Sequence, residues 1–219
     1  MKAEIWNWDF AARIFPSLLE AFLTTLKLAA LGGIGALILG LTWAIILQLR
    51  PVVLTQIVQS FVNVVRSTPL LVQLYVAFYV LPSYGLLMSP EVTGVVGLSI
   101  YFSGYMTAVF QVGIRSIERG QWEAAKVLGL SPLRTWQAII LPQATARVLP
   151  PIGSYLLMLL KESSMLSAIS VSELLHEANT IGSDNFRYVE PLTMAALLYL
   201  SISFPFAVAL RKLEVHLAR

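Results

Sequence analysis

The sequence predicts an all-α integral membrane protein with about five transmembrane helices. Of the 219 residues, 57% are hydrophobic and only 12% are charged, whereas an ordinary soluble domain carries about 25% charged residues. The mean hydropathy is +0.75. A membrane-spanning helix needs roughly 20 mainly apolar residues, and five windows of the chain meet that requirement. They are residues 18–47, 58–81, 92–112, 148–167 and 188–210.

Residues 1–17 come before the first window and are predicted to form an extracytoplasmic, interfacial lead-in. Trp6, Trp8 and Phe10 fall in this stretch, and aromatic side chains of this kind favour the lipid headgroup region. The first apolar window is too long for the core of a cleavable signal peptide. We therefore expect the lead-in to anchor the start of the first helix.

Small residues recur in the first and third windows. Gly32, Ala36 and Gly40 follow one another at intervals of four residues, and Gly97 and Gly104 lie in the third window. Such residues let two membrane helices approach closely. The pattern predicts tight helix packing rather than a ligand site.

The second window contains three polar features, namely Arg66, the pair Thr68 and Pro69, and Gln73. A planar guanidinium group matches a carboxylate, so Arg66 could bind the carboxylate of a solute. It could equally pair with a local carboxylate or mark the inner membrane boundary, with Pro69 kinking the helix, and this structural role is the one we favour. Gln73 could line a solute path or bond a neighbouring helix.

Between the third and fourth windows, residues 115–147 are helical in pattern but too charged to span. Within them GQWEAAKVLGLSP predicts a helix, a sharp turn and a second helix. Gly120 is expected to cap the first helix, with Glu123 in its first turn. Gly129 is expected to end it in the left-handed conformation, Ser131 to cap the second helix, and Pro142 to end that one. The loop could dock into a groove of a partner protein or lie on the membrane surface.

The fourth window is interrupted by four polar residues, Lys161 to Ser164. One charge at the membrane centre costs about 2.5–3.5 kcal/mol on insertion scales, so such residues usually face a water-filled path or one another. We favour a path at a helix break. Alternatively, Lys161 and Glu162 mark the outer end of the helix or anchor a dimer contact. The predicted path residues are Lys161, Glu162, Ser163, Ser164, Gln73 and Arg66.

Orientation follows from the positions of Lys and Arg between the windows, because cytoplasmic loops carry the excess. With the N-terminus outside, nine of these residues are cytoplasmic and three are external. The count predicts an external N-terminus, a cytoplasmic 115–147 loop and a cytoplasmic tail at 213–219.

Several function classes are disfavoured by what the sequence lacks. It contains no cysteine and only two widely separated histidines, so a metal site is not expected. It shows no phosphate-binding G-x-x-x-x-G-K-[ST] loop. We expect a protein without a cofactor that is not itself an enzyme, and no basic aromatic patch suggests nucleic acid as a partner.

Three ordered motifs define a resemblance. The chain contains Glu123-Ala124-Ala125, then Gly129 after three residues, Ile139 after nine more, and Leu141-Pro142 after one more. This spacing resembles the EAA signature of permease subunits of ATP-binding-cassette importers. Residues 65–82 read VRSTPLLVQLYVAFYVLP, and residues 159–174 read LLKESSMLSAISVSEL. Both stretches are similar to segments of the polar amino acid permeases in that family. The resemblance covers roughly residues 18–212, the expected transmembrane domain.

The resemblance implies a type I importer fold in which the 115–147 loop is the coupling helix that docks on a cytoplasmic ATPase dimer. It also implies a second permease, identical or different, an extracytoplasmic solute-binding protein, the bacterial inner membrane, and import of a polar amino acid or a similar zwitterion. The residues it assigns to ATPase coupling are Glu123, Ala124, Ala125, Gly129, Leu141 and Pro142.

One departure concerns the solute. Family members often carry a Glu and an Arg where this chain has Ala108 and Gln111. A carboxylate for a cationic solute is therefore missing at that position, which leaves room for a zwitterion, or for a compatible solute such as ectoine or hydroxyectoine as the alternative cargo. Alternatively, a second, different permease subunit supplies these charges. Two alternatives from other classes are a gated channel and a membrane scaffold protein without ATP coupling.

Overall fold

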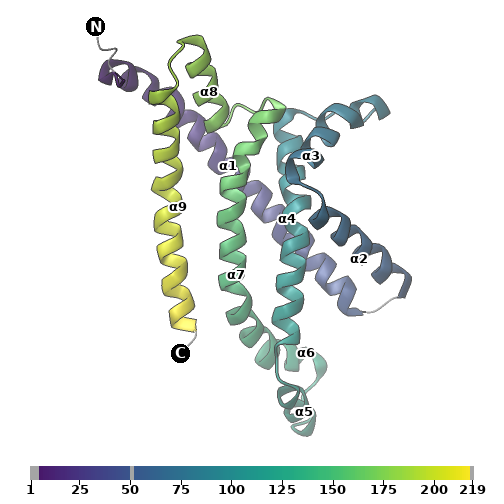
Figure 1. The fold of residues 1–219 in the computed structure, drawn as a ribbon. Coiled ribbons are helices and arrows are strands. Elements are labelled where there is room, and N and C mark those ends of the chain that lie inside the picture. The colour runs from purple at the N-terminus through teal and green to yellow at the C-terminus, as the bar shows by residue number, and fades with distance from the viewer. Residues whose placement is uncertain (1–4, 50–51, 218–219) are drawn as a thin grey trace.

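A computed structural model describes residues 5–49 and 52–217, and all regular elements in these ranges are helices (Figure 1). The predicted all-α class is confirmed. Lys2, Arg50 and Arg219, which enter the charge count, lie outside the described residues. The longer helices are α1 (Trp8–Leu49), α2 (Val52–Ser67), α4 (Pro90–Arg115), α7 (Leu141–Glu162), α8 (Leu174–Asp184) and α9 (Val189–Leu217). The shorter ones are α3 (Leu70–Tyr75), η1 (Val76–Val80), η2 (Leu81–Tyr84), α5 (Arg119–Val127), α6 (Pro132–Thr135), η3 (Trp136–Ile140) and η4 (Ser163–Ile169).

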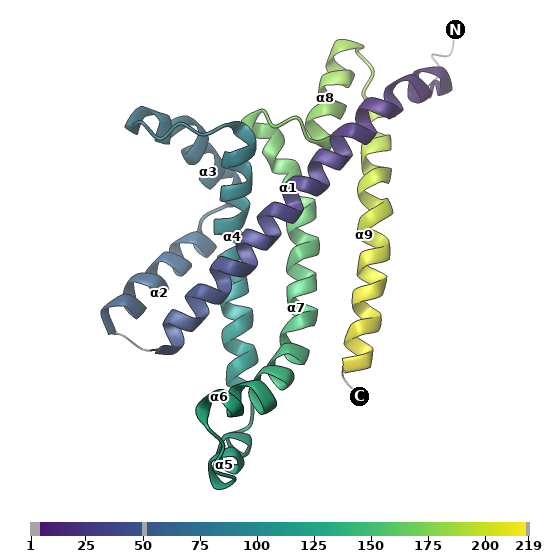
Figure 2. The same ribbon diagram turned by 180° about the vertical axis from the view of Figure 1, so that it is seen from behind.

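The first window is part of α1, a helix of 42 residues that begins at Trp8, so the described end of the lead-in is continuous with the first span. Figure 2 shows α1 running diagonally across α4. The glycines of α1 make this crossing possible. A Cβ atom at Gly40 would lie 2.5 Å from Cβ of Met106, and one at Gly32 would lie 2.9 Å from Cβ of Leu98. The predicted close packing is thus confirmed.

The second window is a broken span rather than one helix. Two stretches, Val53–Ser67 and Leu70–Tyr84, meet at an angle of 106° around Pro69. Proline has no N–H group and restricts the residue before it, which is why the helix cannot continue here. The kink expected at Pro69 is confirmed.

The fourth window is displaced from its expected bounds. Helix α7 begins at Leu141 and ends at Glu162, and the 3-10 helix η4 follows. Within the described ranges, α1, α4 and α9 are each long and apolar enough to cross a membrane, and the bent pair raises the number to four. Helix α7 lies alongside α4 and α9 (Figures 1 and 2), but as a whole it is less apolar than those two helices.

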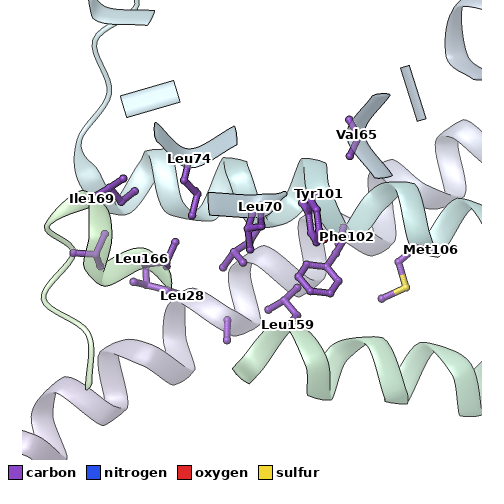
Figure 3. Packing of buried hydrophobic residues seen from close by; sticks show 14 residues of the cluster. Leu28, Val65, Leu70, Leu74, Tyr101, Phe102, Met106, Leu159, Leu166 and Ile169 are labelled. Carbon is purple, nitrogen blue, oxygen red and sulfur yellow. The ribbon is translucent and has the colours of Figure 1, made fainter. Parts of the chain in front are cut away.

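The main core lies where α1, α3, α4, α7 and η4 converge. Figure 3 shows Leu74, Leu159 and Phe102 pointing into it from three of these elements. Lipid tails are as apolar as these side chains, so the core is held by close van der Waals contact more than by removal from water. This core fixes the break in the second span against α4 and α7.

Candidate functional site

The 115–147 loop forms an elbow beyond one end of α4 and α7, made of α5, a tight turn, α6 and η3 (Figure 1). The turn is closed by backbone bonds. The N–H group of Leu130 donates to the carbonyl of Ala125 at 3.0 Å, and that of Gly129 donates to Lys126, also at 3.0 Å. Gly129 has φ of 66°, as this type of helix ending requires. The predicted stop at Gly129 is confirmed.

The start of the second arm is also as predicted. The hydroxyl group of Ser131 accepts a hydrogen bond from the N–H group of Arg134 at 3.4 Å, and Pro132 occupies the first turn. Three details of the loop were wrong. Helix α5 starts at Arg119 with Glu118 as its cap, so Gly120 does not cap it and Glu123 lies beyond its first turn. The second arm also does not end at Pro142.

The arm continues because the π-helix η3 lies directly before α7. A π-turn widens the helix locally, and this accommodates the proline ring and its missing N–H group in the first turn of α7. The second arm of the elbow, made of α6 and η3, is therefore joined to α7 through continuous helical structure.

Of the six predicted coupling residues, one is buried and five are exposed. Ala125 is completely buried. In the same loop the ring centroids of Trp122 and Trp136 lie 5.4 Å apart. Glu123, Ala124, Gly129, Leu141 and Pro142 are exposed. The free surface also includes three apolar side chains that the sequence analysis did not assign to it. They are Val127 (88% exposed), Leu128 (72%) and Leu133 (68%).

The four polar residues at 161–164 have different surroundings. Lys161 and Ser164 line a cavity of about 340 Å³ together with Tyr199 of α9. The side chain of Glu162 is half-buried and does not line this cavity. Ser163 is buried and donates to the carbonyl of Leu160 at 2.7 Å. The structure thus does not bring all four residues to one place.

Arg66 lies in an aromatic cluster that the sequence analysis missed. Its guanidinium carbon is 5.3 Å from the ring centroid of Tyr105. The hydroxyl groups of Tyr105 and Tyr101 are 3.2 Å apart, and the ring of Tyr155 lies 5.3 Å from that of Tyr105. A cation over a tyrosine ring is attracted by the ring quadrupole. The spacing of Tyr101 and Tyr105, one helical turn apart, was the available signal for this cluster.

Gln73 has partners at the break of the second span. Its side-chain N–H₂ group donates to the carbonyls of Val65, at 2.8 Å, and Thr68, at 3.0 Å. These carbonyls belong to the end of α2, where helix hydrogen bonds stop. Within residues 5–49 and 52–217, no three His, Asp or Glu side chains cluster as a metal site would require.

The sequence and the fold of this chain are similar to those of known proteins. The family model described as "Binding-protein-dependent transport system inner membrane component" matches residues 36–218. The probable amino-acid ABC transporter permease protein y4tG of Sinorhizobium fredii is 37% identical over 98% of this chain and 96% of its own length. The L-cystine transport system permease protein TcyB of Bacillus subtilis is 31% identical over 97% of this chain and 92% of its own length.

Two solved structures of transporters have a fold similar to that of this chain. The crystal structure of an amino acid ABC transporter with histidines matches 96% of this chain and 99% of its own, with a TM-score of 0.89 and 29% identity. The inward-facing MetNI methionine ABC transporter shares the fold, with a TM-score of 0.71 and 18% identity over 92% of this chain and 98% of its own.

The chain belongs to the family of inner membrane components of binding-protein-dependent transport systems. It is a permease subunit of an ATP-binding-cassette importer. Family membership implies an ATPase, a solute-binding protein and a second permease as partners. The names of these relatives include no channel and no scaffold protein, so neither of those alternatives is supported.

Proposed function

We propose that this chain, paired with a second permease, forms the membrane pathway for a polar amino acid or a similarly small zwitterion and is driven by a separate ATPase dimer. The observation that supports this best is the elbow. Its shape is held by backbone hydrogen bonds, and it presents Val127, Leu128 and Leu133 uncovered beyond the end of the bundle. Exposed apolar groups in one place favour a protein contact.

The ATPase would dock on the free surface made by these three residues with Glu123, Ala124 and Gly129. Small residues let a partner groove approach the backbone of α5 closely. Closure of the ATPase dimer on ATP would push α5, the hydrogen-bonded turn at Gly129 would pass the movement to α6, and the continuous helix through η3 would pass it on to α7. Leu141 and Pro142 lie where that helix enters the span, so their proposed role is transmission, and Ala125 has an internal packing role.

Gly129→Asp tests the docking. No atom lies within 4 Å of the position that its Cβ would take, and Asp tolerates the left-handed conformation better than most residues. We expect membrane insertion to persist and co-purification with the ATPase to be lost. Gly129→Asn is the matched control, because it has the same shape without the charge. Equal ATPase binding by all three proteins would refute the assignment.

We also propose that the N-terminus is external and that the elbow and the C-terminus are cytoplasmic in the bacterial inner membrane. The charge count supports this orientation. Single cysteines at Leu87 and at Leu128, introduced into the cysteine-free chain, should react with an impermeant maleimide from opposite sides. External labelling of the Leu128→Cys variant would overturn the proposed coupling.

For the solute route we propose the region around Arg66, Tyr101, Tyr105 and Glu162, with Lys161 and Ser164 bordering a second polar cavity. A zwitterion needs a cation and hydrogen-bonding groups close together, and Arg66 with the tyrosine hydroxyls offers both. Arg66→Gln should reduce uptake at least tenfold while ATPase association is retained. Uptake equal to that of the unchanged protein would leave Arg66 with the structural role favoured from the sequence.

A compatible solute remains the second candidate cargo, because Ala108 and Gln111 provide no fixed charge. Reconstituted complex with its binding protein should be assayed with radiolabelled amino acids and with ectoine in parallel. Transport of ectoine alone would replace the amino acid proposal without affecting the coupling assignment.

A further inference from the structure

Helix α2 has three distinct faces. Val58, Val62 and Val65 are buried against the rest of the chain. Val53, Ile57 and Val64 are exposed and apolar, as expected of a face that meets lipid. The third face is exposed and entirely polar, and it consists of Gln56, Gln59, Ser60, Asn63, Arg66 and Ser67. At 100° per residue the midline of this stripe lies about 100° from the midline of the lipid face, and Ser60 and Ser67 form the edge of the stripe nearest to Val53.

This polar stripe is unusual for a helix that belongs to a membrane span. Polar side chains in membranes almost always face the bundle interior or a water-filled cavity. Apart from Arg66, which lies over Tyr105, these side chains are exposed within the single chain, and Gln59 and Asn63 bond each other at 3.0 Å instead of a neighbouring helix. Their environment must therefore be supplied when the importer assembles.

We propose that the polar stripe lines a water-filled part of the solute route, from the break in the second span toward the end of α2 nearest α1. The stripe begins at Arg66, which lies over Tyr105, and so it continues the route proposed above. It extends over roughly 16 Å, about half of the hydrocarbon thickness. Figure 1 shows α2 leading from α3 toward the half of the bundle that carries the elbow.

The chemistry of the stripe suits passage rather than tight binding. Below Arg66 it offers amide and hydroxyl groups, which donate and accept hydrogen bonds without a fixed charge. A solute can exchange such bonds with water at little cost, as conduction requires. Ser, Asn and Gln can also bond a neighbouring membrane helix, so the test has to distinguish a water-lined stripe from a contact with a second copy.

The test uses the absence of native cysteine. Gln56→Cys, Ser60→Cys and Asn63→Cys probe the stripe, and Val53→Cys, Ile57→Cys and Val64→Cys probe the lipid face of the same helix. Each variant is assembled with its ATPase and second permease in inside-out vesicles and exposed to the impermeant cation 2-(trimethylammonium)ethyl methanethiosulfonate. Thiols react as thiolates, which form in water and not in lipid.

We expect the three stripe cysteines to react at least tenfold faster than the three lipid-face cysteines. Ser60→Cys replaces a hydroxyl with a thiol of similar size, so it keeps the test decisive if a larger change disturbs assembly. Stripe rates no higher than the lipid-face rates would overturn the proposal, as would oxidative crosslinking between two copies without labelling.

The inference rests on the proposed function, but the two can fail separately. Labelling rates do not depend on which solute is carried. Reactive stripe cysteines in a complex that transports none of the amino acids tested would contradict only the proposed cargo. Active amino acid uptake by a complex whose stripe cysteines are unreactive would contradict only the stripe.

Discussion

The hydroxyl group of Tyr199 on α9 donates a hydrogen bond of 3.0 Å to Oε2 of Glu173, which is completely buried. The other oxygen of the same carboxylate accepts from the N–H group of His176 at 2.8 Å and caps α8. Beside it, the hydroxyl group of Thr25 on α1 accepts from the N–H group of Leu174 at 3.0 Å. Three helices are thus tied together at one buried polar point.

Replacing Glu173 with Gln should flatten the pH dependence of stability. Burial raises the pKa of this carboxyl group above its usual 4.5, although hydrogen bonds from Leu175, His176 and Tyr199 act against the shift. An acid with a raised pKa makes the free energy of unfolding fall as pH rises from about 4.5 until the folded group ionises. Glu177→Gln, one turn away, is the control. An unchanged pH profile of thermal unfolding in the Glu173→Gln variant would contradict this.

Two glycines should respond oppositely to alanine. At Gly40 the new methyl group would lie 2.5 Å from Cβ of Met106, whereas at Gly120 nothing lies within 4 Å. Overpacking of this kind typically costs about 1–3 kcal/mol, while alanine in an exposed helix is favourable. Thermal unfolding in detergent should show Gly40→Ala destabilised and Gly120→Ala unchanged or slightly stabilised. Equal stabilities would mean that α1 can shift away from α4.

Gln73→Leu should weaken the break in the second span. The change leaves the carbonyls of Val65 and Thr68 without the donor they have now, and a buried acceptor left unpaired costs about 1–3 kcal/mol. We expect a lower unfolding midpoint than for Gln48→Leu, which alters an exposed glutamine at the end of α1. Equal unfolding midpoints for the two variants would mean that water replaces the lost donor at the break.

Leu128→Ser should weaken ATPase binding without changing fold stability. The side chain is 72% exposed, so its truncation should shift stability by no more than about 0.5 kcal/mol. We expect Leu128 to act as a hot spot of the contact, and truncation of a hot-spot side chain costs about 2 kcal/mol or more, roughly a thirtyfold loss of affinity. Leu87→Ser, equally exposed near the start of α4, should bind normally. Affinity measured on immobilised complex distinguishes the two.

Apolar windows and turn chemistry predicted the helical class, the packing glycines, the kink at Pro69 and the left-handed turn at Gly129, because each depends on local sequence. The sequence did not predict which side chains, distant along the chain, contact one another in the fold. Arg66 and Tyr105 are far apart along the chain, and only the break at Pro69 and the path of α4 bring them together. Ala124 and Ala125 are identical neighbours in the sequence, yet Ala124 is exposed and Ala125 is buried within the elbow.

The broken second span also bears on biogenesis. Val53–Ser67 reaches roughly 22 Å at 1.5 Å per residue, too short to cross a bilayer core of about 30 Å unaided. We therefore expect this half-helix to be stable in lipid only when α1 and α4, which contact it, are in place. In a subunit without its second permease the exposed amides of α2 would face lipid, which is energetically costly and should make the unassembled subunit the less stable form.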